Sequence, residues 1–352
     1  MQLSTQTSIS REELINLHDI FYKQGGNFSK KYSEPCLDIL TEIYQGRKIQ
    51  LFDHEFSAIV FALKSFGVTA MDEVIVSSHI NATFLLAITT LGAIPKPIIT
   101  SYSSPKFQTT QLQKFISPKT KAIVLDYIHG VMPELDEIIY LTAQKGIFLL
   151  EYASDGLGAS YKYNPICSFG HIGIIGFNNF NSPINLGCAL IRNDSSIPWA
   201  FSEDNLKKCE IELSELKSAI LLPHLRETDT LKETRKDIWM IYLQFLQILE
   251  DENRFKILGS SEMDSHNFSG LSLIFEEPTI GNELHTYLSE NQVETNIQSN
   301  NSECFLDLPF HPNLTEEEIL RITLYVNEFF GHNDPTDSIL ELRRNFLEDF
   351  DL

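Results

Sequence analysis

Alternating apolar and polar segments begin near residue 55 and predict a repeated helix–strand order. FSAIVFALKSFG (56–67) and ATFLLAITTLG (82–92) carry apolar residues at helical spacing, and each stretch ends in a glycine. Short runs such as EVIVSS (73–78) and KAIVLDYI (121–128) are apolar at almost every position. Strands that are apolar on both faces are typical of a parallel sheet covered by helices on each side. The pattern therefore predicts an α/β fold.

The alternation continues to about residue 200. The prolines in AIPKPIIT (93–100) indicate a bent or peripheral strand. HIGIIGF (171–177) and GCALIRND (187–194) predict a strand pair that closes one side of the sheet, and a turn with four asparagines joins them. The other elements expected in this region are helices at 108–116 and 134–146 and a strand at 147–153.

The pattern changes after residue 200. A long helical stretch at 213–249, in which Pro223 could introduce a kink, precedes a small α+β domain. That domain is expected to contain strands at 269–277 and 304–309 and helices at 282–292 and 316–330. The sequence therefore predicts four parts: an N-terminal segment 1–34, a large α/β domain 35–200, a long helix with a small domain 201–330, and an acidic helical tail 331–352. The tail places Ile339, Leu342, Phe346 and Phe350 on one side, so it is expected to fold back on the domain or to bind a partner.

The charge balance narrows the classes of partner. The formal net charge is −21, from 48 acidic and 27 basic residues. Nucleic acid and anionic membranes need a cationic surface, so neither is predicted as a partner. A phosphorylated small ligand remains compatible with this charge, because a few local dipoles can hold it.

Targeting and metal-binding signals are absent from the sequence. No stretch reaches the length of a membrane-spanning helix, and residues 1–14 lack the apolar core of a secretory signal. A cytoplasmic location is therefore expected, with Cys36, Cys167, Cys188, Cys209 and Cys304 as reduced, mostly buried thiols. No histidine spacing supports a metal site, and no phosphate-binding loop or nucleophile motif occurs.

Six stretches occur in the order found in one known family. They are MDEVIVSS (71–78), LGAIPKP (91–97), ISPKTKAIVLDYIHG (116–130), GASYKYNPICSFGHIG (158–173), LSELKSAI (213–220) and LPFHPNLTEEEILRI (308–322). From about residue 35 to 330 the chain resembles the DegT/DnrJ/EryC1/StrS aminotransferases, pyridoxal-phosphate enzymes of fold type I that act on nucleotide-linked keto-sugars. The resemblance implies a large domain with a mostly parallel seven-stranded sheet, a small C-terminal α+β domain, and a homodimer with its sites at the subunit interface.

Such enzymes need a lysine amine for the Schiff base, a carboxylate beside the pyridine nitrogen, a phosphate cradle at a helix N-terminus and a stacked aromatic ring. The resemblance places Asn181 at the lysine position, and no lysine occurs between Lys162 and Lys207. Lys162 belongs to a surface-like YKYN hairpin and is a poor substitute. Tyr152 stands at the carboxylate position, where a phenol of pKa about 10 would stay neutral.

The other positions implied by the resemblance also depart from the family pattern. Glu55 and Phe56 stand where small and hydroxyl residues cradle the phosphate, and a carboxylate repels a phosphate dianion. The remaining positions are Glu210 and Glu212 in the segment contributed by the partner subunit, Asn81 at the stacking ring, and Asp155 where glutamine or histidine is common. Losing all four functions together predicts that the fold is retained and that no cofactor is bound.

The predicted function is that of a non-catalytic homologue. It would bind a nucleotide sugar, or pair with an active paralogue, in polysaccharide or deoxysugar biosynthesis, as a homodimer or heterodimer. One branch of the family replaces the lysine with histidine and still uses the cofactor for dehydration. An active aminotransferase or dehydratase with an atypical site therefore stays an alternative, as does cofactor-free chemistry.

The amide-rich turn has two interpretations. It could satisfy only buried backbone groups, or it could line a polar pocket for an uncharged or sugar-like ligand. His129 and Gly130 fall at a turn on the carboxyl edge of the sheet, where ligands of such sheets bind. The candidate pocket residues are His79, Asn81, His129, Tyr152, Asp155, Asn178, Asn179 and Asn181.

Overall fold

The computed structural model divides the chain into two compact units. The larger unit is built on Thr7–Lys232 with Glu262–Ser269, and the smaller on Glu233–Ser261 and Gly270–Leu352 with Met1–Gln6. This division falls later than the domain boundary predicted after residue 200. The structure describes residues 9–23, 30–78, 80–99, 108–127, 135–177, 182, 184–200, 211–259, 268–299 and 303–332.

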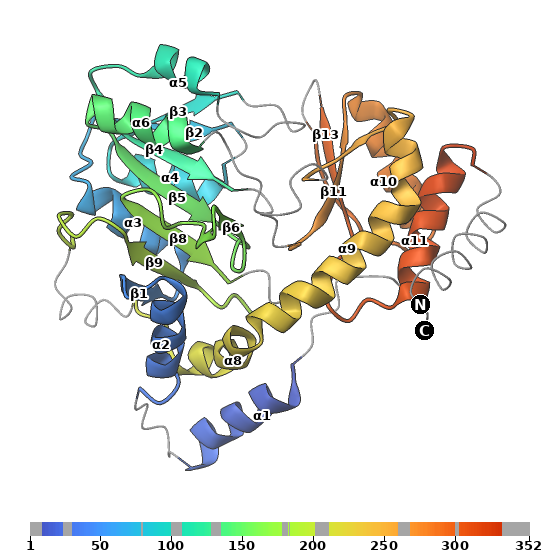
Figure 1. The fold of residues 1–352 in the computed structure, drawn as a ribbon, viewed down its shortest axis with the longest axis horizontal. Helices are drawn as coiled ribbons and strands as arrows, with labels where there is room; N and C mark the ends of the chain where they lie inside the picture. The colour runs from blue at the N-terminus through green and yellow to red at the C-terminus, as the bar shows by residue number, and fades with distance from the viewer. Residues whose placement is uncertain are drawn as a thin grey trace. The chain divides into compact units, whose positions relative to one another are not determined.

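A seven-stranded, mostly parallel sheet forms the centre of the larger unit (Figure 1). Its strand order is β1-β9-β8-β5-β4-β2-β3, and only the pairs that involve β9 are antiparallel. The predicted α/β fold and its mostly parallel seven-stranded sheet are confirmed. The strands are β1 (Lys48–Phe52), β2 (Glu73–Ser77), β3 (Ile94–Ile98), β4 (Thr120–Asp126), β5 (Phe148–Ala153), β8 (Ile172–Gly176) and β9 (Cys188–Arg192).

The central strands are apolar on both faces because helices cover both faces of the sheet. In β4, Val124 packs in one core cluster with α3 and α4, while its neighbours Ile123 and Leu125 pack in the other with α2, α6 and α8. The prolines of β3 are accommodated because β3 is an edge strand, as predicted. These helices are α2 (Ser33–Ile43), α3 (Glu55–Ser65), α4 (Ala82–Thr90), α5 (Thr109–Phe115), α6 (Leu135–Lys145) and α8 (Glu215–Arg226).

The prediction that β8 and β9 close one side of the sheet is wrong. β1 pairs with β9 along all five of its residues and forms the outer edge. Its residues KIQLF are apolar at alternate positions and are too few to give a clear strand signal. The N-terminal helix α1 (Arg11–His18), the π-helical turn η1 (Asp19–Lys23) and α2 were not predicted either, and α1 and α2 both pack on α8.

Pro223 lies inside a helix rather than at a break. Helix α8 continues through Pro223 to Arg226, and the chain changes direction only at Glu227 before α9 (Thr228–Asp251). A proline has no backbone N–H, so the carbonyl of Ala219 cannot receive its usual helical bond. The Asn16 side-chain amide on α1 donates to that carbonyl at 3.0 Å instead and satisfies it.

The smaller unit has its own sheet and core. Its four antiparallel strands lie in the order β10-β11-β13-β12, and α10 (Pro278–Glu290) packs on the sheet and on α11 (Glu316–Phe329). The predicted strand–helix–strand–helix order is confirmed by β11, α10, β13 and α11, while β10 and β12 were not predicted. The strands are β10 (Lys256–Ile257), β11 (Leu271–Phe275), β12 (Asn296–Ser299) and β13 (Cys304–Leu308).

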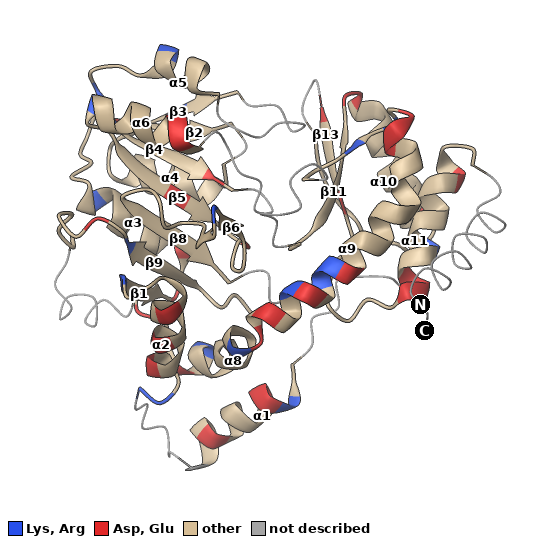
Figure 2. Cartoon of the chain, in the orientation of Figure 1, with Lys and Arg blue, Asp and Glu red and all other residues tan. Residues whose placement is uncertain are grey.

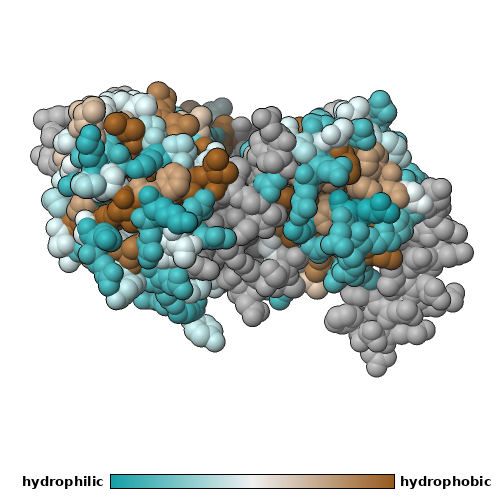
Figure 3. Space-filling model, turned by 90° about the horizontal axis from the view of Figure 1, so that it is seen from above, coloured by the Kyte–Doolittle hydropathy of each residue, from teal (hydrophilic) through white to brown (hydrophobic). Residues whose placement is uncertain are grey.

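The surface is acidic with scattered apolar patches. Acidic residues are prominent on several helices, and α2 carries Glu34, Asp38 and Glu42 with no basic residue (Figure 2). On the face shown in Figure 3, hydrophobic residues form patches between hydrophilic ones. Exposed apolar side chains include Leu86 on α4 and Ile94 on β3. Patches of this kind are compatible with subunit contacts, and dimerisation remains a prediction.

The structure bears on the expected membrane helices, metal clusters and cysteine thiols only within the residues that it describes. No helix in the described ranges is long and apolar enough to cross a membrane. Within the same ranges, no cluster of three or more histidine, cysteine or acidic side chains could hold a metal ion. The described cysteines Cys36, Cys167, Cys188 and Cys304 are buried free thiols, and Cys209 lies outside the described residues. The predicted tail helix 334–352 also lies outside them.

Candidate functional site

The carboxyl ends of β5 and β8 bring together a phenol and a carboxylate. Tyr152 on β5 is buried, and its ring meets the Phe84 ring edge-on with centroids 4.6 Å apart. Its hydroxyl donates a hydrogen bond of 2.9 Å to Glu55 Oε2, which comes from the start of α3. The two residues are 97 positions apart in sequence, and only the sheet topology makes them neighbours.

The environment keeps the Tyr152 phenol protonated. Burial raises the pKa of Tyr152 far above its usual range, and the nearby carboxylates of Glu55 and Asp126 raise it further. A protonated phenol is a neutral hydrogen-bond donor. Tyr152 therefore directs its proton at Glu55 and adds no negative charge to the site.

Glu55 is held at the N-terminus of α3 and against the end of β8. It is the first residue of α3, where the helix dipole favours a carboxylate. At Gly176, an added Cβ would lie 2.8 Å from Glu55 Oε1 and 2.4 Å from the carbonyl oxygen of Ser154. Glycine is thus required at the end of β8 chiefly because the Ser154 backbone carbonyl lies so close, and the Glu55 carboxylate packs on the same position.

Two further predicted site residues have local partners. Asp155, just after β5, accepts hydrogen bonds from the hydroxyls of Ser154 at 3.4 Å and Ser269 at 2.9 Å. Asn81 caps α4, because its Oδ1 accepts the backbone N–H of Thr83 at 2.9 Å. The Asn81 side chain therefore has a structural function in starting the helix.

Phe56 and Lys162 point to other parts of the larger unit. Phe56 is half-buried against the hydrophobic cluster on the α3 and α4 side of the sheet. Lys162 lies in the turn of the β6–β7 hairpin (Ser160–Tyr161 and Asn164–Pro165) and forms an ion pair with Asp136. The prediction of a surface hairpin is confirmed, since more than half of the Lys162 side chain is exposed.

A lysine that the sequence reasoning did not single out contacts Asp53, two residues before Glu55. The Lys217 ammonium group, in the first turn of α8, is 3.0 Å from Asp53 Oδ2 and donates to the Asp53 carbonyl at 3.0 Å. Burial raises the pKa of the Cys188 thiol, Glu55 raises it further and Lys217 opposes this. Glu55 and Lys217 thus both act on one buried thiol of β9. The sequence signal for the contact with Lys217 was an acidic residue, Asp53, directly after a short strand, but that strand, β1, was not predicted.

Of the remaining predicted site residues, Glu212 forms an antiparallel bridge with Phe52 of β1. His79, His129, Asn178, Asn179, Asn181 and Glu210 lie outside the described residues. Among the described ones, the structure joins Tyr152 to Glu55, while Asp155 and Asn81 bond to other partners. The described core of the candidate site is therefore a phenol–carboxylate pair at the carboxyl edge of the sheet, with Asp126 close enough to raise the pKa of Tyr152.

Comparison with known proteins identifies the family. A profile of the DegT/DnrJ/EryC1/StrS aminotransferase family matches residues 56–196. GDP-perosamine synthase from Escherichia coli O157:H7 is 22% identical over 352 residues, which cover 86% of this chain and 95% of that protein. Residues 56–196 thus match the pattern of this family. The resemblance inferred from the six sequence stretches is thus confirmed.

Solved structures of DegT/DnrJ/EryC1/StrS-type aminotransferases share the fold. Helicobacter pylori PseC, an aminotransferase of pseudoaminic acid biosynthesis, superposes with a TM-score of 0.81 at 16% identity, covering 94% of this chain and all of PseC. The putative sugar aminotransferase Spr1654 from Streptococcus pneumoniae, in its PMP form, gives a TM-score of 0.80 at 15% identity, covering 94% and 98%. At these identities the likeness concerns the fold alone.

Proposed function

We propose that this member of the DegT/DnrJ/EryC1/StrS family does not transaminate. In this proposal it keeps the family fold to bind a nucleotide-linked sugar, or to pair with an active paralogue, in polysaccharide or deoxysugar biosynthesis. The relatives are named as enzymes that make amino sugars, such as GDP-perosamine synthase, and these names support the ligand class. The homodimer or heterodimer with its sites at the subunit interface is part of the same proposal.

The observation that carries the proposal is the hydrogen bond from Tyr152 to Glu55. A pyridoxal-phosphate site needs an anionic partner for the protonated ring nitrogen. By the family resemblance Tyr152 stands at that position, and its raised pKa keeps it neutral. The phenol therefore cannot stabilise a pyridinium, and its proton is already donated to Glu55.

The charge of Glu55 supports the same conclusion. The family resemblance assigns Glu55 to the phosphate cradle, and the structure has its carboxylate at the first turn of α3. Two unit charges about 4 Å apart repel by about 4 kcal/mol at an effective dielectric constant near 20, which corresponds to roughly a thousandfold in affinity. The described residues therefore do not fit pyridoxal phosphate, and no reaction step is derived through it.

A direct test combines cofactor absorbance with covalent trapping. The purified protein is mixed with pyridoxal phosphate, its visible spectrum is recorded, and borohydride reduction followed by mass spectrometry detects a pyridoxyl adduct. An active GDP-perosamine synthase serves as the positive control. We expect no visible band at a defined site and no stoichiometric adduct. A yellow protein with one trapped lysine would overturn the proposal, and peptide mapping would show whether that lysine is Lys217.

Two variants separate the physical causes. Glu55→Gln removes the charge but keeps an acceptor for Tyr152, so binding of inorganic phosphate should strengthen by at least tenfold if the carboxylate repels it. Lys217→Met tests whether any residual adduct comes from the lysine that contacts Asp53. Binding of GDP- or dTDP-linked sugars, measured by calorimetry, tests the ligand part, and its absence across such sugars would leave the pairing with a paralogue as the supported form.

A further inference from the structure

A cavity lies at the amino end of the parallel strands of the large sheet, opposite to the end that carries Tyr152. It has a volume of about 450 Å³ and opens where β5 and β8 begin and β9 ends. All of its lining residues belong to the larger unit. Its polar lining residues include Arg47, His171, Asn193 and Asp194, and its apolar lining residues include Ile139, Ala143 and Leu149. A cavity of this size suits a small ligand.

One wall of the cavity is held in place from behind by a buried carboxylate. Glu151 accepts hydrogen bonds from the backbone N–H groups of Cys167 at 3.0 Å and Phe169 at 2.7 Å, from that of Gly170, and from the Tyr127 hydroxyl at 2.7 Å. Glu151 is fully buried. The turn before β8 is therefore fixed without any ligand, and the cavity is preformed.

Asn193 presents an acceptor that has no partner. Its Nδ2 donates to the Cys167 carbonyl at 3.0 Å. This bond fixes the orientation of the amide, because a flipped amide would place its own oxygen against the Cys167 carbonyl oxygen. The other amide atom, Oδ1, is buried and has no hydrogen-bond partner among the described residues. A buried acceptor without a donor costs about 1–3 kcal/mol, so a ligand that donates to it would recover this energy.

His171 presents a donor beside this acceptor. The Leu149 backbone N–H donates to its Nδ1 at 2.9 Å, so the ring proton resides on Nε2. The rings of Phe66 and Phe148 meet the imidazole edge-on and hold it in place. Burial lowers the pKa of His171, so the ring is neutral at pH 7 and acts as a donor through Nε2–H.

The cavity also contains one charge of each sign. The Arg47 guanidinium donates to the backbone carbonyls of Tyr44 at 3.0 Å and Ser168 at 3.4 Å, which leaves its positive charge without a carboxylate partner in the described ranges. Asp194 accepts the Ser196 backbone N–H at 2.8 Å, and this bond helps to keep its pKa low. Arg47 and Asp194 form no ion pair with each other, so both charges are available to a ligand.

We propose that this cavity binds a free α-amino acid with a small apolar side chain. The ligand carboxylate lies at Arg47 and the Nε2–H of His171, the ammonium group lies at Asp194 and Oδ1 of Asn193, and the side chain contacts the apolar lining. A zwitterion matches the two opposite charges and both unused hydrogen-bonding groups at once. This site is separate from the Tyr152 edge and does not depend on the proposed function.

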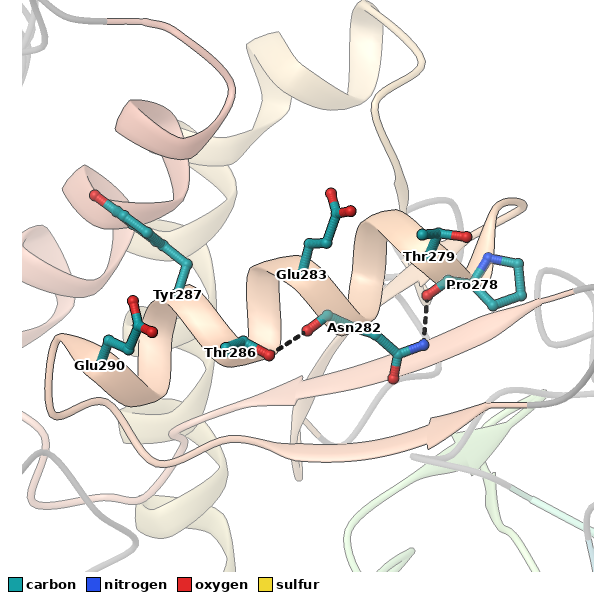
Figure 4. A pocket seen from close by; sticks show the side chains of 7 residues that line it. All are labelled: Pro278, Thr279, Asn282, Glu283, Thr286, Tyr287 and Glu290. Atoms are coloured by element: carbon teal, nitrogen blue, oxygen red, sulfur yellow. Dashed lines mark hydrogen bonds between the residues drawn. The ribbon is translucent and has the colours of Figure 1, made fainter.

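A cavity on α10 lacks the paired charges of opposite sign found in the proposed site (Figure 4). It is similar in size, about 510 Å³, but the Asn282 amide and the Thr286 hydroxyl are bonded within the helix. Asn282 donates to the Pro278 carbonyl at 2.6 Å, and Thr286 donates to the Asn282 carbonyl at 2.9 Å. Its charged lining residues, Glu283 and Glu290, are both acidic. This surface therefore offers a matched control.

The test is calorimetric titration of the full chain with L-alanine and L-valine. We expect saturable binding that is lost with the methyl esters, which lack the carboxylate, and with the N-acetyl derivatives, which lack the ammonium group. Absence of saturable binding at millimolar concentration would overturn the proposal. Binding of the N-acetyl derivative or of the ester as tight as that of the amino acid would overturn it as well.

Variants locate the site. Asp194→Asn keeps the acceptor for Ser196 and should weaken binding at least tenfold, as should Arg47→Met, because each leaves one ligand charge unpaired. Asn282→Leu on α10 should leave binding unchanged. Circular dichroism confirms that each variant is folded, and Asp194→Asn, which changes a single atom, is decisive if Arg47→Met fails to fold. Binding that survives Asp194→Asn undiminished would refute the assignment.

Discussion

The Asn16 side chain should be worth a measurable part of the stability of the larger unit. Asn16 Nδ2 donates at 3.0 Å to the carbonyl of Ala219, a fully buried residue whose helical donor is missing because Pro223 has no N–H. Asn16→Ala leaves that carbonyl unsatisfied, and an unsatisfied buried backbone group costs about 1–3 kcal/mol. We expect the free energy of unfolding to fall by this amount.

A double-mutant cycle isolates the cause. Pro223→Ala restores a backbone N–H that can donate to Ala219, so in that background Asn16→Ala should cost less than about 0.5 kcal/mol. The expected coupling is therefore about 1–2 kcal/mol. Urea unfolding followed by circular dichroism measures each corner of the cycle. Ile15→Ala, which changes an exposed residue of the same helix, is the control and should cost less than about 0.5 kcal/mol. Equal costs of Asn16→Ala in both backgrounds would refute the reasoning.

Three further predictions use other buried polar groups. Glu151→Gln replaces one carboxylate oxygen with an NH2 group that faces backbone N–H donors, so it should lower the free energy of unfolding in urea by about 2–4 kcal/mol, whereas the exposed Glu276→Gln should cost under about 0.5 kcal/mol. Similar costs for the two would count against the fixed turn. Tyr152→Phe deletes the donor to Glu55 and should cost about 1 kcal/mol by the same assay, and no loss would mean that the bond does not hold the pair. Burial acts to raise the pKa of Glu13, but hydrogen bonds from its neighbours outweigh burial, so the pKa is lowered. The stabilisation from Glu13 is therefore present above about pH 4.5 and is lost as the pH falls further. Glu13→Gln should flatten this acid part of the profile of stability against pH, and an unchanged profile would contradict the prediction.

Local pattern was sufficient for most elements of the large sheet. The strands expected at 73–78 and 147–153 match β2 and β5 to within about one residue, because strands buried on both faces give unbroken apolar runs. The edge strand β1 was missed because it is only five residues long and two of them, Lys48 and Gln50, are polar. The end of α8 was missed, because one continuous helical stretch was expected over 213–249, whereas the structure ends α8 at Arg226 and begins α9 at Thr228.

The candidate site followed only in part from the sequence. The resemblance identified Tyr152 and Glu55 as unusual residues, but nothing in the chain indicated that one donates to the other, since 97 positions separate them. Asn81 was assigned to a pocket, although its position directly before a helix is that of a typical N-cap. The cavity of Arg47 and Asp194 gave no sequence signal, because its residues come from separate strand and helix ends.

The sequence by itself determined the resemblance to the family, most of the order of helices and strands, and the lack of a lysine between positions 162 and 207. These are properties of the chain read in order, where each residue is judged with its near neighbours. Only the tertiary structure decided which polar groups meet: Tyr152 with Glu55, Asn16 with Ala219, and Glu151 with the turn before β8. Hydrogen bonds act over about 3 Å, and the sheet topology brings distant parts of the chain within that range.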